Sequence, residues 1–304
     1  MNCVLMQAAN SRADLVRFQM KKLFAIAALM VVTACASAQE KVIRVSVVSQ
    51  DPNAAYALTM LRLAIAHIDT PYRIEEVTEE YTQSRVNEEI RTGGLDLGWI
   101  ASDNELESTL RPIRIPLFKG LLGYRVFMIN ADNQHKFAGI ETLEQLKQRI
   151  TMGQGRTWAD ARILEANGFK VIKTEKYPGL FYMVDGGRFD AFPRGVHEPF
   201  TEIAERPHLN LAVEKNLMIA YKMPYYFFVT PGNESLAQDI EAGLNRAIAN
   251  GSFNEAFMNA PQVKDVIEKA NIKNRRVFFI DNPTLTKETP LDRSELWFDP
   301  ADLQ

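Results

Sequence analysis

The chain has 304 residues, of which 46% are hydrophobic and 24% charged, and its formal net charge at pH 7 is −3. This mildly acidic balance argues against nucleic acid or an anionic membrane surface as a partner. The four histidines are widely spaced and both cysteines precede residue 36, so the sequence shows no zinc-ligand pattern. We therefore expect neither a metal site nor a cofactor.

Residues 20–38 have the layout of a secretory signal peptide. A basic start at Lys21 and Lys22 is followed by an apolar run over 23–32 and by the small residues Ala36-Ser37-Ala38. The run of about ten residues is too short to span a bilayer. We therefore predict cleavage near Ala38 and a periplasmic mature protein.

The same segment leaves two alternatives about the ends of the mature chain. The basic-then-apolar order begins at Met20, so we predict that this residue is the initiator and that residues 1–19 are an upstream extension. Cys35 closes a run that resembles a lipoprotein box, and lipid anchoring there is the alternative to cleavage at Ala38. Cleavage would remove Cys3 and Cys35, so the mature domain would have no disulfide.

Strand-like and helix-like segments alternate from Ile43 onward, which indicates an α/β fold. Apolar residues at helical spacing predict a helix through Leu58 and Ile68. In the first part we predict strands over 43–48, 72–77 and 95–100, with a second helix over 81–92.

A similar order returns later in the chain. Thr142 and Gln145 predict a capping box, and a helix follows through Ile163 and Ala166. The remaining predicted elements are strands over 150–152, 171–172 and 189–192 and a helix over 177–184.

Two short runs suggest that the two parts are built alike. Gly93-Gly94-Leu95-Asp96 and Gly187-Arg188-Phe189-Asp190 both indicate the end of a helix followed by a strand with an early Asp. Chance similarity within an α/β protein is the simpler interpretation. Two lobes of similar construction is the more specific one.

The third part favours two lobes. An apolar strand over 225–230, a long helix from Leu236 to Ile248, and a helix capped by Ser252 and Glu255 are too few to form their own core. We expect them to pack on the first lobe. The predicted division is 39–128 with 225–285 as lobe 1, 129–224 as lobe 2, and a surface tail over 286–304 with Trp297 against a lobe. Crossings near 129–134 and 220–224 would form a hinge.

At this point the chain resembles the periplasmic solute-binding proteins of the second structural type, the polar amino-acid group known as bacterial extracellular solute-binding protein family 3. The resemblance spans about 41–270. It is carried by the order of four runs: Gly93-Gly94-Leu95-Asp96-Leu97, Gly123-Tyr124-Arg125-Val126-Phe127-Met128, Gly187-Arg188-Phe189-Asp190-Ala191-Phe192, and 244–257 with Asn250-Gly251-Ser252.

The resemblance implies two lobes, each a mixed sheet flanked by helices, joined by two crossing segments. It also implies a monomer that hands a small solute to a membrane permease, as in ABC importers, or to a sensor domain. The ligand carries over less well than the fold. The arginines within 108–116 do not fall in register with the arginine that grips a ligand carboxylate in amino-acid binders, and Arg194 has no counterpart in that pattern. Glu198 could replace the usual second-lobe Asp.

Four strand ends are candidates for the site, because ligands of open α/β sheets bind beyond the carboxyl ends of strands. They are Ser49-Gln50-Asp51, Ala101-Ser102-Asp103, Gly155-Arg156-Thr157-Trp158 and 194–198. The third is the strongest, since Arg156 suits a carboxylate, Thr157 can cap the next helix or donate to an anion, and Trp158 offers an apolar wall. A plain helix start with a solvent-facing Arg156 and a core Trp158 is the alternative.

The other candidates have similarly plain alternatives. Arg194 and Glu198 would be a second anion clamp and a cation acceptor, or else a solvated surface pair; Trp99 would line the cleft or lie in the core. His197 is expected to be structural or exposed. The predicted ligand-binding set is Gln50, Tyr56, Trp99, Ser102, Arg156, Thr157, Trp158, Arg194, Glu198 and Tyr225.

These observations predict non-catalytic capture of a small polar solute, anionic or zwitterionic and amino-acid-like, with no catalytic residues. One alternative is a lyase or dehydratase on the same scaffold, with His197 and Glu198 as acid or base. The other is a binding-like protein whose partner is a protein.

Overall fold

The computed structural model describes residues 40–46, 51, 53–77, 79 and 81–299. The predicted signal peptide over 20–38, the alternative lipid acceptor Cys35 and the candidate ligand residue Gln50 lie outside these residues. Within the described ranges, no helix is both long and apolar enough to cross a membrane.

The first part of the chain follows a β-α-β-α-β order. Its elements are β1 (Lys41–Ser46), α2 (Ala54–Ala66), β2 (Tyr72–Val77), α3 (Gln83–Thr92) and β3 (Leu97–Ala101). β1 and β2 pair in parallel, whereas β3 pairs with β11 (Tyr225–Val229). β11 also pairs with β4 (Arg111–Ile113), which completes a three-stranded antiparallel sheet.

The same order recurs further along the chain. Its elements are β6 (Met152–Gly155), α6 (Ala159–Ala166), β7 (Val171–Thr174), α7 (Tyr177–Asp185) and β8 (Phe192–Gly195). β6 and β7 again pair in parallel. β8 joins a five-stranded sheet that also contains β5 (Tyr124–Asn130), β9 (Leu211–Val213), β10 (Leu217–Ala220) and β12 (Arg276–Phe279).

An aspartate clamp is common to both copies. Gly93 and Gly187 take the left-handed conformation at the ends of α3 and α7, with φ of +82° and +69°. The Asp96 amide donates to the Arg44 carbonyl, and the Arg44 amide donates to the Asp96 carboxylate at 2.8 Å. Asp190 and Thr151 make the same two hydrogen bonds, with 3.0 Å between the Thr151 amide and the Asp190 carboxylate. The similar construction that the two glycine-aspartate runs predicted is therefore present.

The chain passes between the two larger sheets at residues 114–123 and 221–224. The second passage agrees with the crossing expected near 220–224. The first does not lie at 129–134, because the apolar end of β5 is a buried strand that pairs with β8 and β9. The passages touch at Gly123, where a Cβ would lie 1.9 Å from the Tyr221 carbonyl oxygen, so this position requires glycine.

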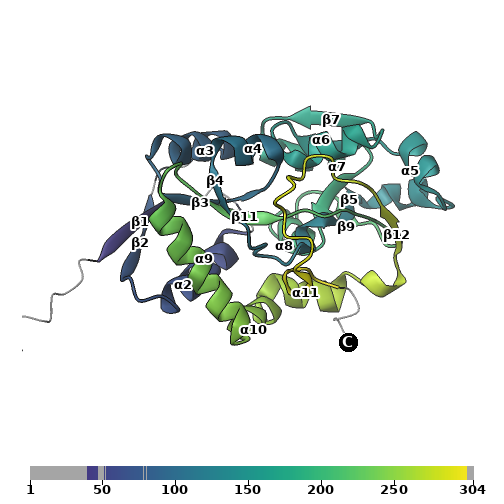
Figure 1. Cartoon of the computed structure of the whole chain (residues 1–304). Helices are drawn as coiled ribbons and strands as arrows, with labels where there is room; N and C mark the ends of the chain where they lie inside the picture. The colour runs from purple at the N-terminus through teal and green to yellow at the C-terminus, as the bar shows by residue number, and fades with distance from the viewer. Residues whose placement is uncertain (1–39, 47–50, 52, 78, 80, 300–304) are drawn as a thin grey trace, which may run out of the picture. The chain divides into compact units, whose positions relative to one another are not determined.

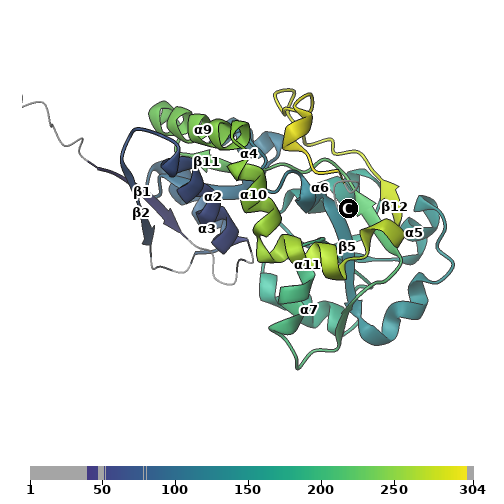
Figure 2. The same cartoon turned by 90° about the horizontal axis from the view of Figure 1, so that it is seen from below.

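Two helices of the third part contact α2 in the first part. α9 (Glu234–Ala249) lies beside α2 (Figures 1 and 2), and α10 (Ser252–Asn259) and α11 (Pro261–Lys269) follow it. The first part thus packs against α9 and α10, whereas β12, from later in the chain, pairs with β10 of the five-stranded sheet. Shorter elements are α4 (Asn104–Thr109), α5 (Leu143–Arg149), α8 (Pro199–Ala204), and the 3₁₀ turns η1 (Leu121–Gly123), η2 (Ala131–Phe137), η3 (Ile272–Asn274) and η4 (Ser294–Leu296).

The two predicted helix caps differ in outcome. The capping box of Thr142 and Gln145 is present at α5, with both hydrogen bonds made. The cap predicted at Ser252 and Glu255 is wrong, because α10 begins after Gly251 and Ser252 is already its first helical residue. The Ser252 hydroxyl donates instead to the Asn250 side chain.

Residues 280–299, which we call the C-terminal strap, contact several distant elements (Figure 1, yellow). The Thr284 carbonyl accepts from the Asn104 amide at the start of α4, and the Asp281 carbonyl accepts from the Asn167 side chain after α6, both at 2.8 Å. Trp297 is only 8% exposed and packs against Gly120. The tail is thus held by α4, α6 and the first passage.

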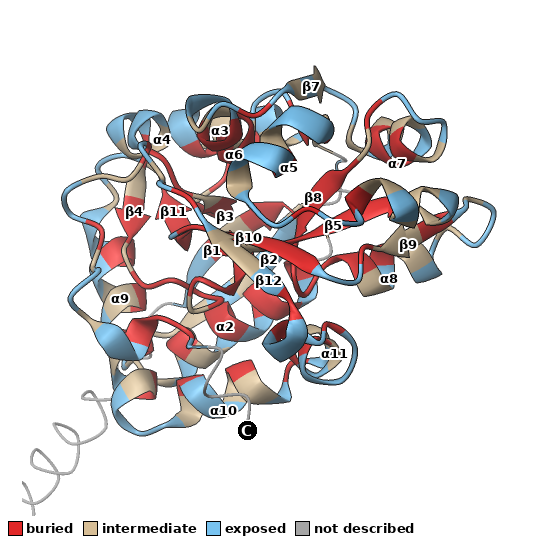
Figure 3. Ribbon diagram, turned by 90° about the vertical axis from the view of Figure 1, so that its right-hand side faces the viewer, coloured by how far each residue is buried: buried red, intermediate tan, exposed pale blue. Residues whose placement is uncertain are grey.

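The core follows the longest apolar strands. All five residues of β11 are buried, and β5, β8 and β10 are largely buried at the centre of the view in Figure 3. Burial of large side chains such as Phe127 and Phe227 contributes about 2 kcal/mol each. The sheets thereby hold the loops at their carboxyl ends in fixed positions.

Candidate functional site

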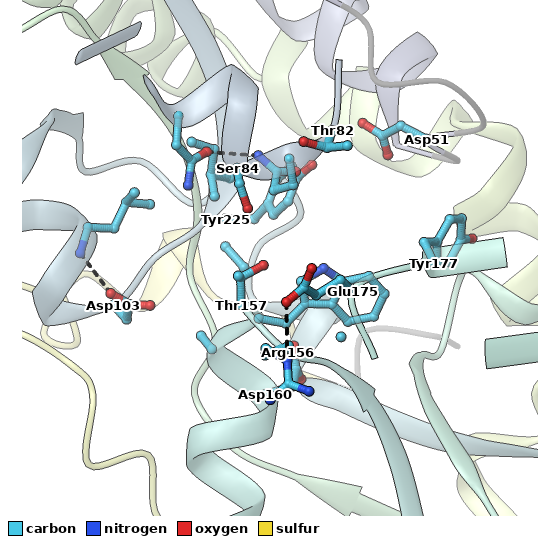
Figure 4. A pocket seen from close by; sticks show the side chains of 18 of the residues that line it. Asp51, Thr82, Ser84, Asp103, Arg156, Thr157, Asp160, Glu175, Tyr177 and Tyr225 are labelled. Atoms are coloured by element: carbon cyan, nitrogen blue, oxygen red, sulfur yellow. Dashed lines mark hydrogen bonds and ion pairs between the residues drawn. The ribbon is translucent and has the colours of Figure 1, made fainter. Parts of the chain in front are cut away.

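A cavity of about 1040 Å³ lies at the carboxyl ends of β1, β3, β6, β7 and β8. Its walls include residues from all four strand-end segments expected from the sequence. In Figure 4, Asp51, Thr82, Ser84 and Tyr225 line one side and Arg156, Thr157 and Glu175 face them from the other. Cavities of this order accept small molecules.

Arg194 lies in the part of the cavity lining that we call the inner wall, where aromatic rings and carboxylates surround it. Its guanidinium binds Glu202 with an Nε–Oε2 distance of 2.9 Å and Glu198 at 3.1 Å. The Tyr177 hydroxyl donates to the same Glu202 carboxylate at 2.5 Å. The rings of Trp158, Tyr177 and Phe192 surround the cation at 4.9–5.6 Å. Arg194 and Glu198 are buried, so the interpretation as a solvated surface pair is excluded.

A second buried ion pair adjoins the first. Arg125 of β5 binds Asp160 of α6 at 2.6 Å and lies 3.5 Å from Glu198. Tyr221 accepts a hydrogen bond from Arg125 and donates one to Asp160. Burial opposes ionisation of Glu198, but the charges of Arg194 and Arg125 and the hydrogen bond from Asn53 outweigh it and lower its pKa. Glu198 is therefore a carboxylate shared by two arginines.

Asn53 connects this cluster to the loop between β1 and α2. Its side-chain amide donates to Glu198 at 3.1 Å, and its backbone amide donates to Asp51 at 2.9 Å. The other Asp51 oxygen accepts from the Trp99 indole at 2.9 Å. Burial raises the pKa of Asp51 despite these N–H donors, and the nearby Glu198 charge adds to the rise.

His197 is a neutral structural residue. Its ring stacks on Phe118 with 4.4 Å between centroids, and Nε2 contacts the Asn53 side-chain oxygen at 3.0 Å. Because that oxygen accepts, Nε2 carries the proton. Burial lowers the pKa of His197 to about 4. His197 does not line the cavity.

The outer wall carries the segment from Gly155 to Trp158. A Cβ on Gly155 would lie 2.5 Å from the Trp158 ring, so glycine gives this ring space against the backbone. Thr157 lines the cavity but does not cap α6, whose N-cap is Trp158. Arg156 pairs with Glu175 at 3.4 Å, and their side chains are 55% and 76% exposed (Figure 4).

The structure brings together six of the predicted site residues and separates three. Arg156, Thr157, Trp158, Arg194, Glu198 and Tyr225 line the cavity. Trp99 and Ser102 lie behind its wall, where Trp99 holds Asp51 and the Ser102 hydroxyl donates to Glu107 at 2.6 Å. Tyr56 is in the core and donates to the Leu117 carbonyl. Gln50 is outside the described residues.

Several lining residues were not predicted from the sequence. Asp51 was included in a candidate strand end but not chosen, although its position directly after β1 was a usable signal. Arg125 and Asp160 lie on different elements, and nothing in their local sequence links them. Asp103 caps α4 and pairs with Arg162 of α6, which makes a contact across the cavity. In the described part of the chain, no three His, Cys, Asp or Glu side chains form a metal-binding group.

Comparison with known proteins identifies the fold. No family model matches the chain, and no curated protein matches it. A solved structure described as an ancestral arginine-binding protein bound to arginine is similar, with 15% identity, a TM-score of 0.53, and coverage of 72% of this chain and 97% of that one. The chain has the fold of the two-lobe periplasmic binding proteins.

Two further solved structures are similar in the same way. The probable amino-acid ABC transporter extracellular-binding protein ytmK from Bacillus subtilis has 14% identity and a TM-score of 0.57, with 74% of this chain and 100% of that one covered. A histidine kinase sensor domain with similarity to periplasmic binding proteins has 13% identity and a TM-score of 0.52, with 72% and 94% covered. The two-lobe fold thus occurs in proteins described as serving transport and in one described as a sensor.

Proposed function

We propose that the protein captures a small, polar, amino-acid-like zwitterion in the cavity without catalysing a reaction. The observation that carries this proposal is the cavity itself, lined by the loops of both β-α-β-α-β copies and flanked by fixed charges of both signs. The neighbours described as arginine-binding and as amino-acid-binding support the same class of ligand.

Opposite ends of the cavity suit opposite charges. Arg156 and Thr157 offer donors for a carboxylate, and the exposed pair between Arg156 and Glu175 is a weak interaction that a ligand can displace. Asp51 offers an acceptor for an ammonium group, and Trp158 and Tyr225 supply aromatic walls. Arg194 has two carboxylate partners already, so we assign it to positioning Glu198 rather than to holding an anion.

Closure would come from movement of the two β-α-β-α-β copies about the passages at 114–123 and 221–224. The contact between Asp103 and Arg162 would then hold the closed form. The protein would be exported, and the closed form would be recognised by a membrane importer or by a sensor.

The test is a thermal-shift screen, followed by calorimetry, on protein refolded to remove carried-over ligand. We expect at least one zwitterionic amino acid or close analogue to raise the Tm, with a single site by calorimetry. The Arg156→Ala variant should lose affinity for that ligand at least tenfold, whereas Arg149→Ala, on the outer face of α5, should not. No stabilisation across amino acids, amines and small carboxylates would reject the proposal.

A further inference from the structure

The C-terminal strap is a further connection between the two parts of the molecule, in addition to the passages at 114–123 and 221–224. It leaves the five-stranded sheet at the end of β12, where the Ile280 amide donates to the Ala220 carbonyl of β10 at 3.0 Å. Further along, the Arg293 side chain donates at 3.0 Å to Asn245 of α9, which packs beside α2. The strap therefore begins on the sheet that contains β8 of the second copy and continues on elements packed with the first (Figure 1, yellow).

Two strap carbonyls that are three positions apart bind two different helices. The Asp281 carbonyl accepts from the Asn167 side chain directly after α6, and the Thr284 carbonyl accepts from the Asn104 amide in the first turn of α4, both at 2.8 Å. These are the two helices whose ion pair makes a contact across the cavity. The strap and the ion pair therefore hold the same two helices together.

The segment between the two carbonyls is short and locally fixed. The Asn282 side-chain oxygen accepts from the Thr284 amide at 2.9 Å and from the Thr284 hydroxyl at 2.7 Å. Pro283 lies inside this turn, and its ring fixes its own φ angle. Even a fully extended chain spans only about 10 Å over three residues. α4 and α6 therefore cannot move further apart than this segment allows unless one of the two hydrogen bonds breaks.

The two ends of this segment are held unequally. On the α4 side, the Thr286 hydroxyl donates at 3.0 Å to Glu107, whose side chain is only 3% exposed. Glu107 also accepts from Ser102 at 2.6 Å and from Arg114 at 2.7 Å, so the strap joins a buried network there. On the α6 side, the contact is the exposed hydrogen bond from Asn167. Opening would therefore release α6 and leave the strap on α4.

We propose that residues 281–286 of the strap are a tether that limits opening of the cavity by holding α4 close to α6. The ligand-free protein then stays near the conformation in which Asp103 and Arg162 are paired. A protein already held in its binding-competent conformation binds more tightly, because the apparent affinity scales with the population of that conformation. This consequence for affinity rests on the proposed function, whereas the tether itself is a property of the chain without ligand.

The test measures the distance between α4 and α6 in the full chain without ligand, by pulsed electron paramagnetic resonance. Both native cysteines would be changed to serine, and spin labels would be attached after Ser108→Cys on α4 and Ala166→Cys on α6, two exposed positions that do not line the cavity. Insertion of Gly-Ser-Gly-Ser between Asn282 and Pro283 lengthens the tether. We expect this insertion to increase the mean distance between the labels and to broaden its distribution.

The same insertion between Lys287 and Glu288 is the matched control. Both positions are exposed and lie on the strap after Thr286, so this insertion lengthens the strap without lengthening the tether. We expect it to leave the label distance unchanged. An increase as large as that caused by the first insertion would overturn the inference, because the distance would then not depend on residues 281–286.

A pair of point substitutions tests the tether without changing the length of the chain. Asn167→Ala removes the donor to the Asp281 carbonyl. Asn245→Ala is its control, because Asn245 likewise donates to the carbonyl four residues earlier in the chain and contacts the strap, but on α9. We expect only Asn167→Ala to increase the label distance. If neither Asn167→Ala nor the insertion after Asn282 increases it, the inference is wrong.

Affinity is the second readout, measured by calorimetry with a ligand from the thermal-shift screen. Both tether variants should bind that ligand at least threefold more weakly than their controls, since a larger population of open forms lowers the fraction competent to bind. Unchanged affinity beside a longer label distance would overturn the inference, because the tether would then not favour the binding form. If the screen finds no ligand, the proposed function fails, and the label distances still decide whether the strap is a tether.

Discussion

At the scale of single residues, the arginines of the inner wall act by fixing the positions of the carboxylates that they bind. Arg194 sits among three aromatic rings and binds Glu198 and Glu202, and this arrangement fixes Glu198, which lines the cavity. Buried ion pairs of this kind add little net stability when intact, but removal of one partner leaves the other charge buried without a counter-charge. The inner wall is therefore rigid because any partial disruption is costly.

Glu202→Ala tests this rigidity. Removal of the carboxylate leaves Arg194 with Glu198 alone and leaves the Tyr177 hydroxyl without its acceptor. We expect the free energy of unfolding to fall by about 3–5 kcal/mol in urea denaturation. Glu205→Ala is the matched control in the next turn, where the side chain is 58% exposed, and it should change stability by less than about 0.5 kcal/mol. A loss below about 1 kcal/mol for Glu202→Ala would contradict the assignment.

Sequence reasoning found two residues of this wall. Arg194 and Glu198 were recognisable because they follow a predicted strand. Arg125, Asp160 and Tyr221 were not, because their contacts join residues that are far apart in the chain, 61 positions in the case of Tyr221 and Asp160. Local patterns carry no information about such pairs. The ion pairs and hydrogen bonds of the inner wall therefore became visible only in the structure.

At the scale of elements, local signals determined the repeated β-α-β-α-β order well. Helix ends marked by left-handed glycines and by the Thr142 capping box lie where the sequence indicates them. β4, β9, β10 and β12 were not predicted, because a strand of three or four residues is too short for an alternation to stand out. The first passage was misplaced because a continuous apolar run cannot by itself show where a strand leaves its sheet.

The α5 cap gives a prediction at this scale. Thr142→Ala removes the oxygen that accepts from the Gln145 amide, and we expect a loss of about 1 kcal/mol in the free energy of unfolding. Thr59→Ala is the control, since its hydroxyl only contacts the Ala55 carbonyl within the exposed face of α2. That change should be neutral or slightly stabilising. Equal effects of the two substitutions in thermal denaturation would show that the cap does not matter.

At the scale of the whole described unit, the C-terminal strap joins α4, which follows the first copy, to the end of α6 in the second. It contacts α4, the end of α6 and the first passage, so it restrains the same parts that line the cavity. Its last turn buries Leu296, Trp297 and Phe298. The strap accordingly runs largely over the surface and is anchored in the core by these three residues.

Trp297→Ala measures that restraint. Loss of the ring leaves a void against Gly120 and Lys222, and we expect a cost of about 3–5 kcal/mol in urea denaturation. Leu291→Ala lies on the same strap with 51% exposure and should cost less than about 0.5 kcal/mol. If the Trp297→Ala variant has the same urea midpoint as the unchanged protein, Trp297 does not anchor the strap.

The placement of the three tryptophans has a practical consequence. Trp99 donates its indole proton to Asp51, and the Trp158 ring lies over Arg194 in the cavity wall, whereas the third indole is tied to the Pro290 carbonyl. The fluorescence of Trp99 and Trp158 would therefore change if a ligand bound in the cavity, whereas Trp297 would serve as an internal reference.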